Sequence, residues 1–177
     1  MISDKAKDLS SKQHIEHSEE IWKQGEERFR NACNILDIPF REATEEEQFQ
    51  HIDFVIGGGI KIDVKGFKNT HEYGYVLLEF KNVQGKAGWC SEESGAHMIA
   101  FDMDHHFLIV PVKWLIQFSR EQYIAAGKPP MVTASKMPPY DTMLYKLYQR
   151  QNRKDLMMLI RSTDLFQCPS YWLWRVR

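Results

Sequence analysis

The sequence 51-HIDFVIGGGIKIDVKGF-67 is the stretch that decides the fold. Its first six residues form a short apolar run rich in strand-forming side chains, which is typical of a β-strand. The glycines at 57–59 predict a tight turn. In the last part apolar and polar residues alternate, so Asp63 and Lys65 would project from one face of a second strand and the isoleucines from the other. The stretch therefore predicts a β-hairpin.

Helices and further strands are expected on both sides of this hairpin. Apolar residues recur every three or four positions from residue 11 to 37, which predicts a helix that ends before Pro39. An acidic connector at 42–48 leads from that helix into the hairpin. After the hairpin we expect a strand at 75–83, a second hairpin from the apolar runs 96–104 and 106–112, a helix at 112–127, helical structure at 142–162 and a last strand in 169–177. This order predicts an α+β (mixed α/β) fold.

The composition excludes several classes of protein. No apolar run approaches the roughly 18 residues that a membrane helix needs, and the polar N-terminus has no apolar signal segment. A cytoplasmic location is therefore expected, which would be the host cytoplasm for a viral protein. Cys33, Cys90 and Cys168 form no CxxC pair and are odd in number, which argues against a disulfide framework and against a cysteine zinc site.

Charge is distributed unevenly along the chain. The formal net charge is −1, yet residues 146–177 hold seven Lys and Arg against two Asp and Glu. A basic segment on a near-neutral protein can attract phosphates. The alternative is a solvated helix face with a charged terminus, and composition alone leaves both open.

The candidate chemistry lies in the hairpin. Asp53 sits inside an apolar run, where a charge is costly unless it is paired or bound to a metal. The Gly57–Gly59 turn would bring Asp53 next to Asp63 on the following strand. Two close carboxylates repel each other, and Mg²⁺ or Mn²⁺ would relieve that repulsion. Lys65, on the same face as Asp63, would stabilise charge on a phosphate or orient a water molecule. A solvated sheet face remains the alternative for Asp63 and Lys65, and a turn cap for Asp53.

The pattern D53-x9-D63-V-K65, preceded by a helix rich in glutamate, resembles the PD-(D/E)XK nuclease superfamily. It is similar to small phage endonucleases and Holliday-junction resolvases. The resemblance covers residues 18–110 and departs from the family at Ile52, which stands where proline is common. It implies an αβββαβ core with a central mixed sheet flanked by helices, a Mg²⁺-dependent (or Mn²⁺-dependent) deoxyribonuclease activity, DNA as the partner and a homodimer.

The resemblance also implies a glutamate from the first helix. Glu26 fits that place, with Glu20 and Glu27 as alternates. Glu79-Phe-Lys81 is a rival (D/E)-x-K motif. We favour Asp63 and Lys65 because the glycine turn explains their proximity to Asp53, and Glu79 would then be an additional ligand. DNA contacts are expected from the Gly-rich segment and from the basic segment: Lys81, Gln84, Lys86, Trp89, Arg150, Arg153 and Lys154. Trp89 would either stack on a base, if it is exposed, or pack in the core.

These expectations define the organisation of the chain. Residues 1–127 would form the nuclease core, and residues 128–177 a C-terminal helical extension packed on it within the same domain. The alternative function is a non-catalytic nucleic-acid- or protein-binding module that retains the nuclease fold. A degenerate module usually loses part of its acid-acid-lysine set, whereas this chain keeps Asp53, Asp63 and Lys65, which favours the enzyme.

Overall fold

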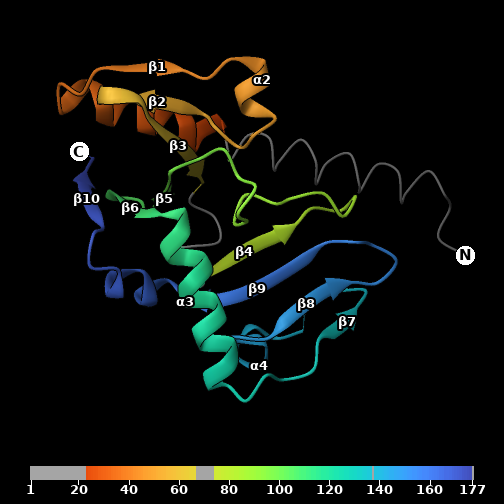
Figure 1. Cartoon of the computed structure of the whole chain (residues 1–177). Coiled ribbons are helices and arrows are strands. Elements are labelled where there is room, and N and C mark those ends of the chain that lie inside the picture. The colour runs from red at the N-terminus through yellow and green to blue at the C-terminus, as the bar shows by residue number, and fades with distance from the viewer. Residues whose placement is uncertain (1–22, 67–73, 137, 177) are drawn as a thin grey trace, which may run out of the picture.

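The computed structural model describes residues 23–66, 74–136 and 138–176, which fold into two mixed β-sheets and several helices. The predicted α+β class is confirmed. Figure 1 shows the two sheets one above the other, with the helix α3 (Val112–Ala125) running beside both. The expected single central sheet is wrong, because the strands divide between a six-stranded sheet A and a four-stranded sheet B.

Sheet A contains the predicted hairpins and the last strand. Its order is β1-β2-β3-β5-β6-β10, with β3 and β5 parallel and all other neighbours antiparallel. The strands are β1 (Phe40–Glu42), β2 (Phe54–Ile56), β3 (Ile60–Lys65), β5 (Met98–Asp102), β6 (His106–Pro111) and β10 (Trp172–Arg175). The short 3₁₀ turn η1 (Gly57–Gly59) joins β2 to β3. Gly58 and Gly59 adopt φ values of 69° and 92°, which glycine reaches without a steric penalty.

Sheet B has the order β4-β9-β8-β7. Its strands are β4 (Tyr75–Lys81), β7 (Val132–Ala134), β8 (Leu147–Arg150) and β9 (Leu156–Arg161). The predicted strand at 75–83 therefore exists, but it pairs with β9 and not with the Asp53–Asp63 hairpin. Since β4 precedes residue 128 and its partner follows it, both predicted parts of the chain contribute to one sheet.

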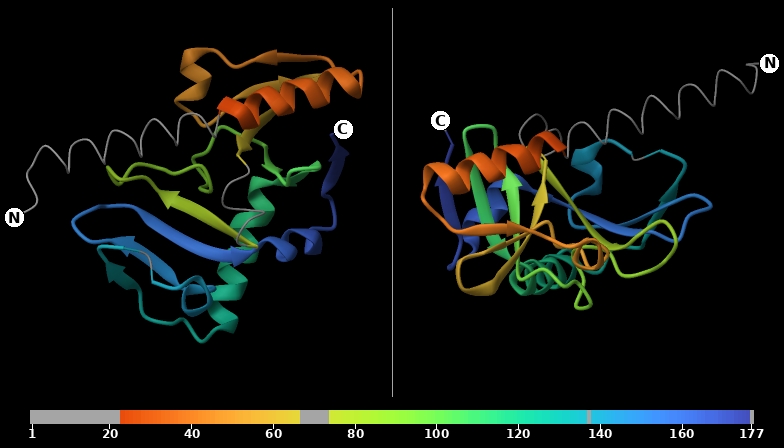
Figure 2. Two further views of the ribbon diagram at one scale, coloured as in Figure 1. Left: turned by 180° about the vertical axis from the view of Figure 1, so that it is seen from behind. Right: turned by 90° about the horizontal axis from the view of Figure 1, so that it is seen from above.

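A separate hydrophobic core packs against each face of sheet A. The helix over residues 23–35 packs on one face of sheet A, where Phe29 contacts Phe54, Phe107 and Trp174. The other face of sheet A shares a core with α3 and sheet B. Figure 2 shows the helix over 23–35 and α3 on opposite sides of sheet A. Three short helical segments complete the described fold: α2 (Glu45–Gln48), α4 (Tyr140–Met143) and η3 (Ser162–Gln167). Within the described ranges, no helix has the length and hydropathy needed to cross a bilayer.

The predicted helical structure at 142–162 is wrong, because the strands β8 and β9 lie in this segment. Strand β9 is buried on both faces: Met158 and Ile160 enter the core shared with α3, while Met157 and Leu159 pack against Tyr148. A strand buried on both faces shows no apolar-polar alternation, so its sequence does not distinguish it from a buried helix. The turn before β9 is set by buried Asp155, which accepts a hydrogen bond from the Arg150 backbone N–H at 3.0 Å.

Candidate functional site

The β2–β3 hairpin places Asp53 and Asp63 opposite each other. The regular pairing of β2 with β3 ends at Phe54 and Ile62, and beyond it the Asp53 N–H donates to the Ile62 carbonyl at 2.8 Å, which keeps Asp53 beside the part of β3 that carries Asp63. Phe54 and Ile62 point into the core under the first helix. Because side chains alternate along a strand, the two aspartates face the other side of sheet A.

Hydrogen bonds hold the two carboxylates in place. The Val64 N–H donates to Asp53 Oδ2 at 2.7 Å, and Lys65 Nζ donates to Asp63 Oδ1 at 2.7 Å. Asp63 is only 2% exposed, and its Oδ2 atom is buried without a hydrogen-bond partner in the described structure. A buried carboxylate oxygen left unsatisfied is costly, so this atom is available to a further ligand.

Burial disfavours the charged forms of both aspartates, and the charge of Asp63 adds to this effect at Asp53. Burial, followed by the charge of Asp63, raises the pKa of Asp53 to about 7, and the Val64 N–H counteracts this in part. Burial also raises the pKa of Asp63, against the effect of the Lys65 ammonium. The two carboxyl groups lie close enough for each to affect the pKa of the other. A cation beside them would favour the ionised forms.

Glu26, on the first helix, lies within electrostatic range of this pair. A Cβ atom on Gly25 would lie 3.1 Å from the Gly66 Cα, so the helix backbone packs closely against the end of β3. Burial, followed by the charge of Asp53, raises the pKa of Glu26 to about 7. Among the alternates, Glu27 is exposed, and Glu20 lies outside the described residues.

Glu79 approaches the same group of side chains from sheet B. Burial raises its pKa, and the nearby charges of Lys65 and His51 oppose this. Lys81, its partner in the rival motif, is exposed, and the β4–β9 register shifts between the two residues. The structure therefore places Glu79 within electrostatic range of Lys65, while Lys81 lies on the surface.

Trp89 lies beneath the lysine of the site. Lys65 Nζ is 5.1 Å from the centroid of the Trp89 ring, an arrangement in which the ring face attracts the cation. The side chain is 8% exposed and packs edge-on against Phe101, so the structure shows the second of the two alternatives, packing in the core, and the predicted DNA contact through an exposed ring is wrong. A Gly-rich segment suggests a loop, but it contains no signal that the loop folds inward. This contact was missed by sequence reasoning.

A close backbone approach turns Trp89 inward. Gly88 N–H donates to the Phe80 carbonyl and Cys90 N–H to the Glu79 carbonyl, at 3.0 and 2.9 Å. A Cβ atom on Gly88 would lie 2.4 Å from the Glu79 carbonyl oxygen, which excludes any other residue without a shift of the backbone. The loop is thus fastened to β4 beside the site. His51 also contacts it, with Nε2 3.3 Å from the Ala87 carbonyl oxygen.

The other expected DNA-binding residues come together at one end of sheet B. The Lys154 N–H donates to the Val83 carbonyl at 3.3 Å, which joins the turn after β4 to the turn before β9. Arg150 forms an ion pair with buried Asp155 and lies within electrostatic range of Glu79. The remaining members are exposed: Lys81, Gln84, Lys86, Arg153 and Lys154. We call this surface, residues 81–86 with 150–154, the basic rim.

Within the described ranges, no three His, Cys, Asp or Glu side chains are arranged as a complete metal site. The arrangement consists of two facing aspartates and a lysine, with Glu26 and Glu79 in their electrostatic surroundings. Comparisons with protein-family models, with curated protein sequences and with solved structures give no match.

Proposed function

We propose that the chain is a metal-dependent endonuclease of the PD-(D/E)XK type that hydrolyses phosphodiester bonds in DNA. One observation carries this proposal: Asp53 and Asp63 face each other beside the Lys65 ammonium, and Asp63 Oδ2 is buried with no protein partner among the described residues. A divalent cation fits this group, because it would satisfy the free oxygen and offset the repulsion between the carboxylates.

Asp53 and Asp63 would hold the cation, with Glu26 completing the set and Glu79 as the alternate carboxylate. Proteins commonly bind Mg²⁺ through one or two carboxylates together with substrate phosphates and water. A site with fewer than three protein side chains in place therefore suits Mg²⁺ or Mn²⁺. When bound, the ion would polarise the phosphate and lower the pKa of an attacking water.

The side chains around Asp53 and Asp63 would supply the other catalytic roles. Lys65 would stabilise the additional negative charge that a phosphate develops during attack, and Asp63 and Trp89 hold its ammonium in place. Burying these charged groups costs free energy, and a catalytic role would explain why they are buried.

The basic rim would hold the DNA backbone. Its exposed lysines and arginine come from the end of β4 and from two turns of sheet B, and Arg150 lies within electrostatic range of Glu79 beside the site. Contacts of this kind are independent of base sequence and weaken as salt rises. DNA in the cytoplasm, of the host if the protein is viral, would be the substrate.

The proposal rests on the site more than on the order of elements. A PD-(D/E)XK core would begin with a helix and three strands, and here the helix over 23–35 is followed by β1, the short α2, β2 and β3. The next long helix, α3, follows β6 instead of β3, and β4 lies in the other sheet.

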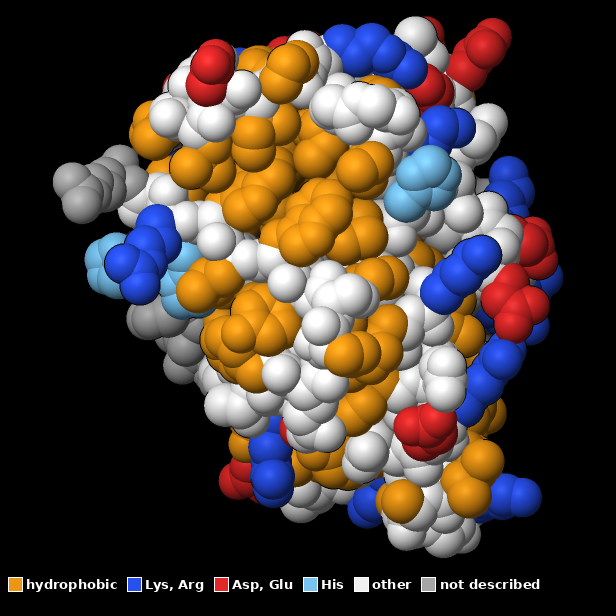
Figure 3. All heavy atoms as spheres, turned by 60° about the vertical axis from the view of Figure 1, so that its left-hand side comes forward, with side chains coloured by type: hydrophobic (Ala, Val, Ile, Leu, Met, Phe, Trp, Pro, Cys, Tyr) orange, Lys and Arg blue, Asp and Glu red, His pale blue; other side chains and the backbone are white. Residues whose placement is uncertain are grey.

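A homodimer is part of the proposal. Strand β10 is an outer strand of sheet A, so one of its edges can pair with another strand. Figure 3 shows hydrophobic side chains spread over the face that carries this end of the sheet. Phe166, Tyr171 and Leu173 are 45%, 39% and 43% exposed. Antiparallel pairing of two β10 strands about a two-fold axis would cover them with their own copies.

A non-catalytic binding module is the second candidate, and one observation favours it. Lys65 and Asp63 already neutralise each other, and no complete three-residue metal site is present among the described residues. Such a module would bind DNA through the basic rim without cutting it.

Cleavage of supercoiled plasmid, linear duplex and a four-way junction in Mg²⁺ or Mn²⁺ separates the two candidates. The nuclease cuts at least one substrate, and Asp63→Asn abolishes the cutting while the exposed Asp37→Asn control retains it. If folded wild-type protein binds the substrates but leaves all of them intact with either metal, the nuclease is excluded in favour of the module.

A further inference from the structure

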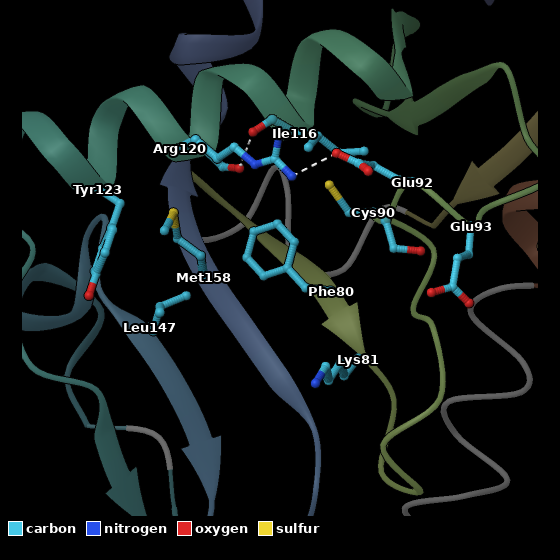
Figure 4. A pocket seen from close by; sticks show the side chains of 12 residues that line it. Phe80, Lys81, Cys90, Glu92, Glu93, Ile116, Arg120, Tyr123, Leu147 and Met158 are labelled. Atoms are coloured by element: carbon cyan, nitrogen blue, oxygen red, sulfur yellow. Dashed lines mark hydrogen bonds and ion pairs between the residues drawn. The ribbon is translucent and has the colours of Figure 1, made fainter.

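A cavity of about 390 Å³ lies between sheet B and α3, beside the segment 90–93. It falls within the roughly 300–1,000 Å³ range typical of small-molecule sites. Figure 4 shows the Phe80 ring at its centre, between β9 and α3. The side chains and loop residues that line it come from β4, β8, β9, α3 and the segment 90–93.

The walls of the cavity are apolar and include two aromatic rings. Phe80 and Tyr123 contribute the rings, and Ile116, Leu147 and Met158 the aliphatic surface. The Tyr123 hydroxyl donates to the Pro129 carbonyl at 3.1 Å, which fixes the position of its ring. Aromatic rings and a methionine thioether make favourable contacts with a flat π-system. The walls therefore suit a planar ring.

One edge of the cavity carries both hydrogen-bond donors and hydrogen-bond acceptors. Arg120 Nη2 donates to Glu92 Oε1 at 2.7 Å, and this ion pair lies along the edge in Figure 4. Both side chains are more than 60% exposed, so a ligand can reorganise the pair at little cost. Ser91 Oγ, on the same segment, is buried without a hydrogen-bond partner in the described structure. A ligand would thus meet donors and acceptors side by side.

We propose that this cavity binds a nucleobase, with the ring between Phe80 and the α3 side chains and its polar edge at Arg120, Glu92 and Ser91. A nucleobase is planar, apolar on its faces and lined with both donors and acceptors at its edge. Lys81 stands at the opening opposite the ion pair, where it would meet the phosphate of the same nucleotide. Lys81 also belongs to the basic rim, so the cavity opens beside the surface proposed to hold DNA.

The base can come from a free nucleotide or from an unpaired position in a strand. Binding of a free nucleotide is independent of the proposed nuclease activity. Binding of a strand rests on that proposed function and extends it to substrates with an unstacked base. Because EDTA removes metal-dependent cleavage, binding measured in EDTA tests the cavity whether or not the protein cuts DNA.

Two fluorescent probes test the proposal on the full chain in EDTA: 2-aminopurine riboside monophosphate and a single strand with one internal 2-aminopurine. We expect saturable quenching with at least one probe. Arg120→Ala should weaken it about tenfold by removing a charged hydrogen-bond donor. Leu147→Phe should weaken it by filling the cavity, and Glu121→Ala, on the same helix but outside the cavity lining, should leave it unchanged.

The pattern of outcomes identifies the source of the base. Quenching of the monophosphate indicates a nucleotide site, and quenching of the strand alone indicates a substrate base. The proposal is overturned if neither probe is quenched, or if Arg120→Ala and Leu147→Phe, both shown to be folded by circular dichroism, bind like Glu121→Ala. Equal affinity for the strand and for a matched strand with an abasic site would also overturn it for the strand.

Discussion

Asp53 and Asp63 are each held by one specific hydrogen bond, and both have pKa values raised by burial. A pair of carboxyl groups in this state reduces the stability of the fold once both are ionised. Such arrangements cluster at functional sites because the strain is relieved by a ligand. The loss of folding stability that accompanies ionisation of Asp53 can therefore be measured.

The pH dependence of stability should reveal that cost. The folded protein keeps the Asp53 proton up to a pKa of about 7, whereas an unfolded aspartate releases it near pH 4. The stability that this proton contributes is fully present below pH 4 and is lost as the pH rises through about 7. The free energy of unfolding of the wild type should therefore decrease between pH 5 and pH 8. In Asp53→Asn, which has no proton to lose at this position, we expect the decrease to be smaller by roughly 1–3 kcal/mol. Urea denaturation at each pH measures this.

Asp37→Asn, an exposed substitution, is the control for the pH experiment. An identical pH dependence in wild type, Asp53→Asn and Asp37→Asn would mean that Asp53 is not the strained group.

Trp89 should position Lys65. Replacing it by leucine keeps an apolar side chain but removes the ring face that attracts the ammonium, a contact worth roughly 0.5–2 kcal/mol. We expect the cleavage rate at saturating DNA to fall by about three- to thirtyfold, with little change in KM. Trp89→Phe restores most of the rate because it keeps an aromatic face. Equal losses in the leucine and phenylalanine variants would argue that Trp89 serves packing alone.

The elements that surround the site differ in how well the sequence predicts them. The glycine turn and the alternating residues of β3 predicted the hairpin, because both signals are local. Strand β9 was read as helical, since Met157 and Ile160 are buried on opposite faces and leave no alternation. The assignment of β4 to a second sheet depends on pairing with residues some eighty positions later, which no local pattern encodes.

The candidate site residues also differ in whether a local sequence pattern predicts them. The proximity of Asp53, Asp63 and Lys65 could be predicted because their spacing matches a hairpin, and Glu26 was proposed because a family resemblance points to the first helix. The contact between Trp89 and Lys65 depends on how the 82–91 loop folds back onto β4. Gly88 makes that fold possible, but a glycine in a loop carries no information about which backbone it approaches.

Gly88→Ala tests this element directly. The added Cβ atom would lie 2.4 Å from the Glu79 carbonyl oxygen, so the loop must move away from β4. We expect a loss of roughly 1–3 kcal/mol in the free energy of unfolding, together with a drop in cleavage as Trp89 leaves Lys65. Gly57→Ala is the matched control, because a Cβ there has no neighbour within 4 Å among the described atoms. Equal stability of the two variants would contradict the close packing of loop and strand.

At the scale of the whole molecule, two sheets meet around α3 and leave the aspartate pair between the end of sheet A and strand β4. The basic rim lies at one end of sheet B, and the outer strand β10 lies at the far edge of sheet A. A dimer through β10 would therefore keep the site and the rim free for DNA.

Oligomeric state tests that arrangement. We expect light scattering after size exclusion to give twice the 20.9 kDa chain mass for wild type. Leu173→Arg should yield monomers, because it places a charge in the proposed interface. Val83→Arg is the control. Val83 is 41% exposed, close to the 43% of Leu173, but it lies in the turn after β4, away from the proposed interface. A monomeric wild type, or a dimer that survives Leu173→Arg, contradicts pairing through β10.

The most direct test of the central claim measures Mn²⁺ affinity and DNA cleavage on the same samples of wild type, Asp63→Asn and Lys65→Met. The aspartates should bind the metal and Lys65 should act on the phosphate. Wild type should therefore bind Mn²⁺ and cut DNA, Asp63→Asn should do neither, and Lys65→Met should bind Mn²⁺ but cut about a hundredfold more slowly or less. Cleavage that persists in Asp63→Asn, or a folded wild type with no affinity for Mn²⁺, would contradict the account.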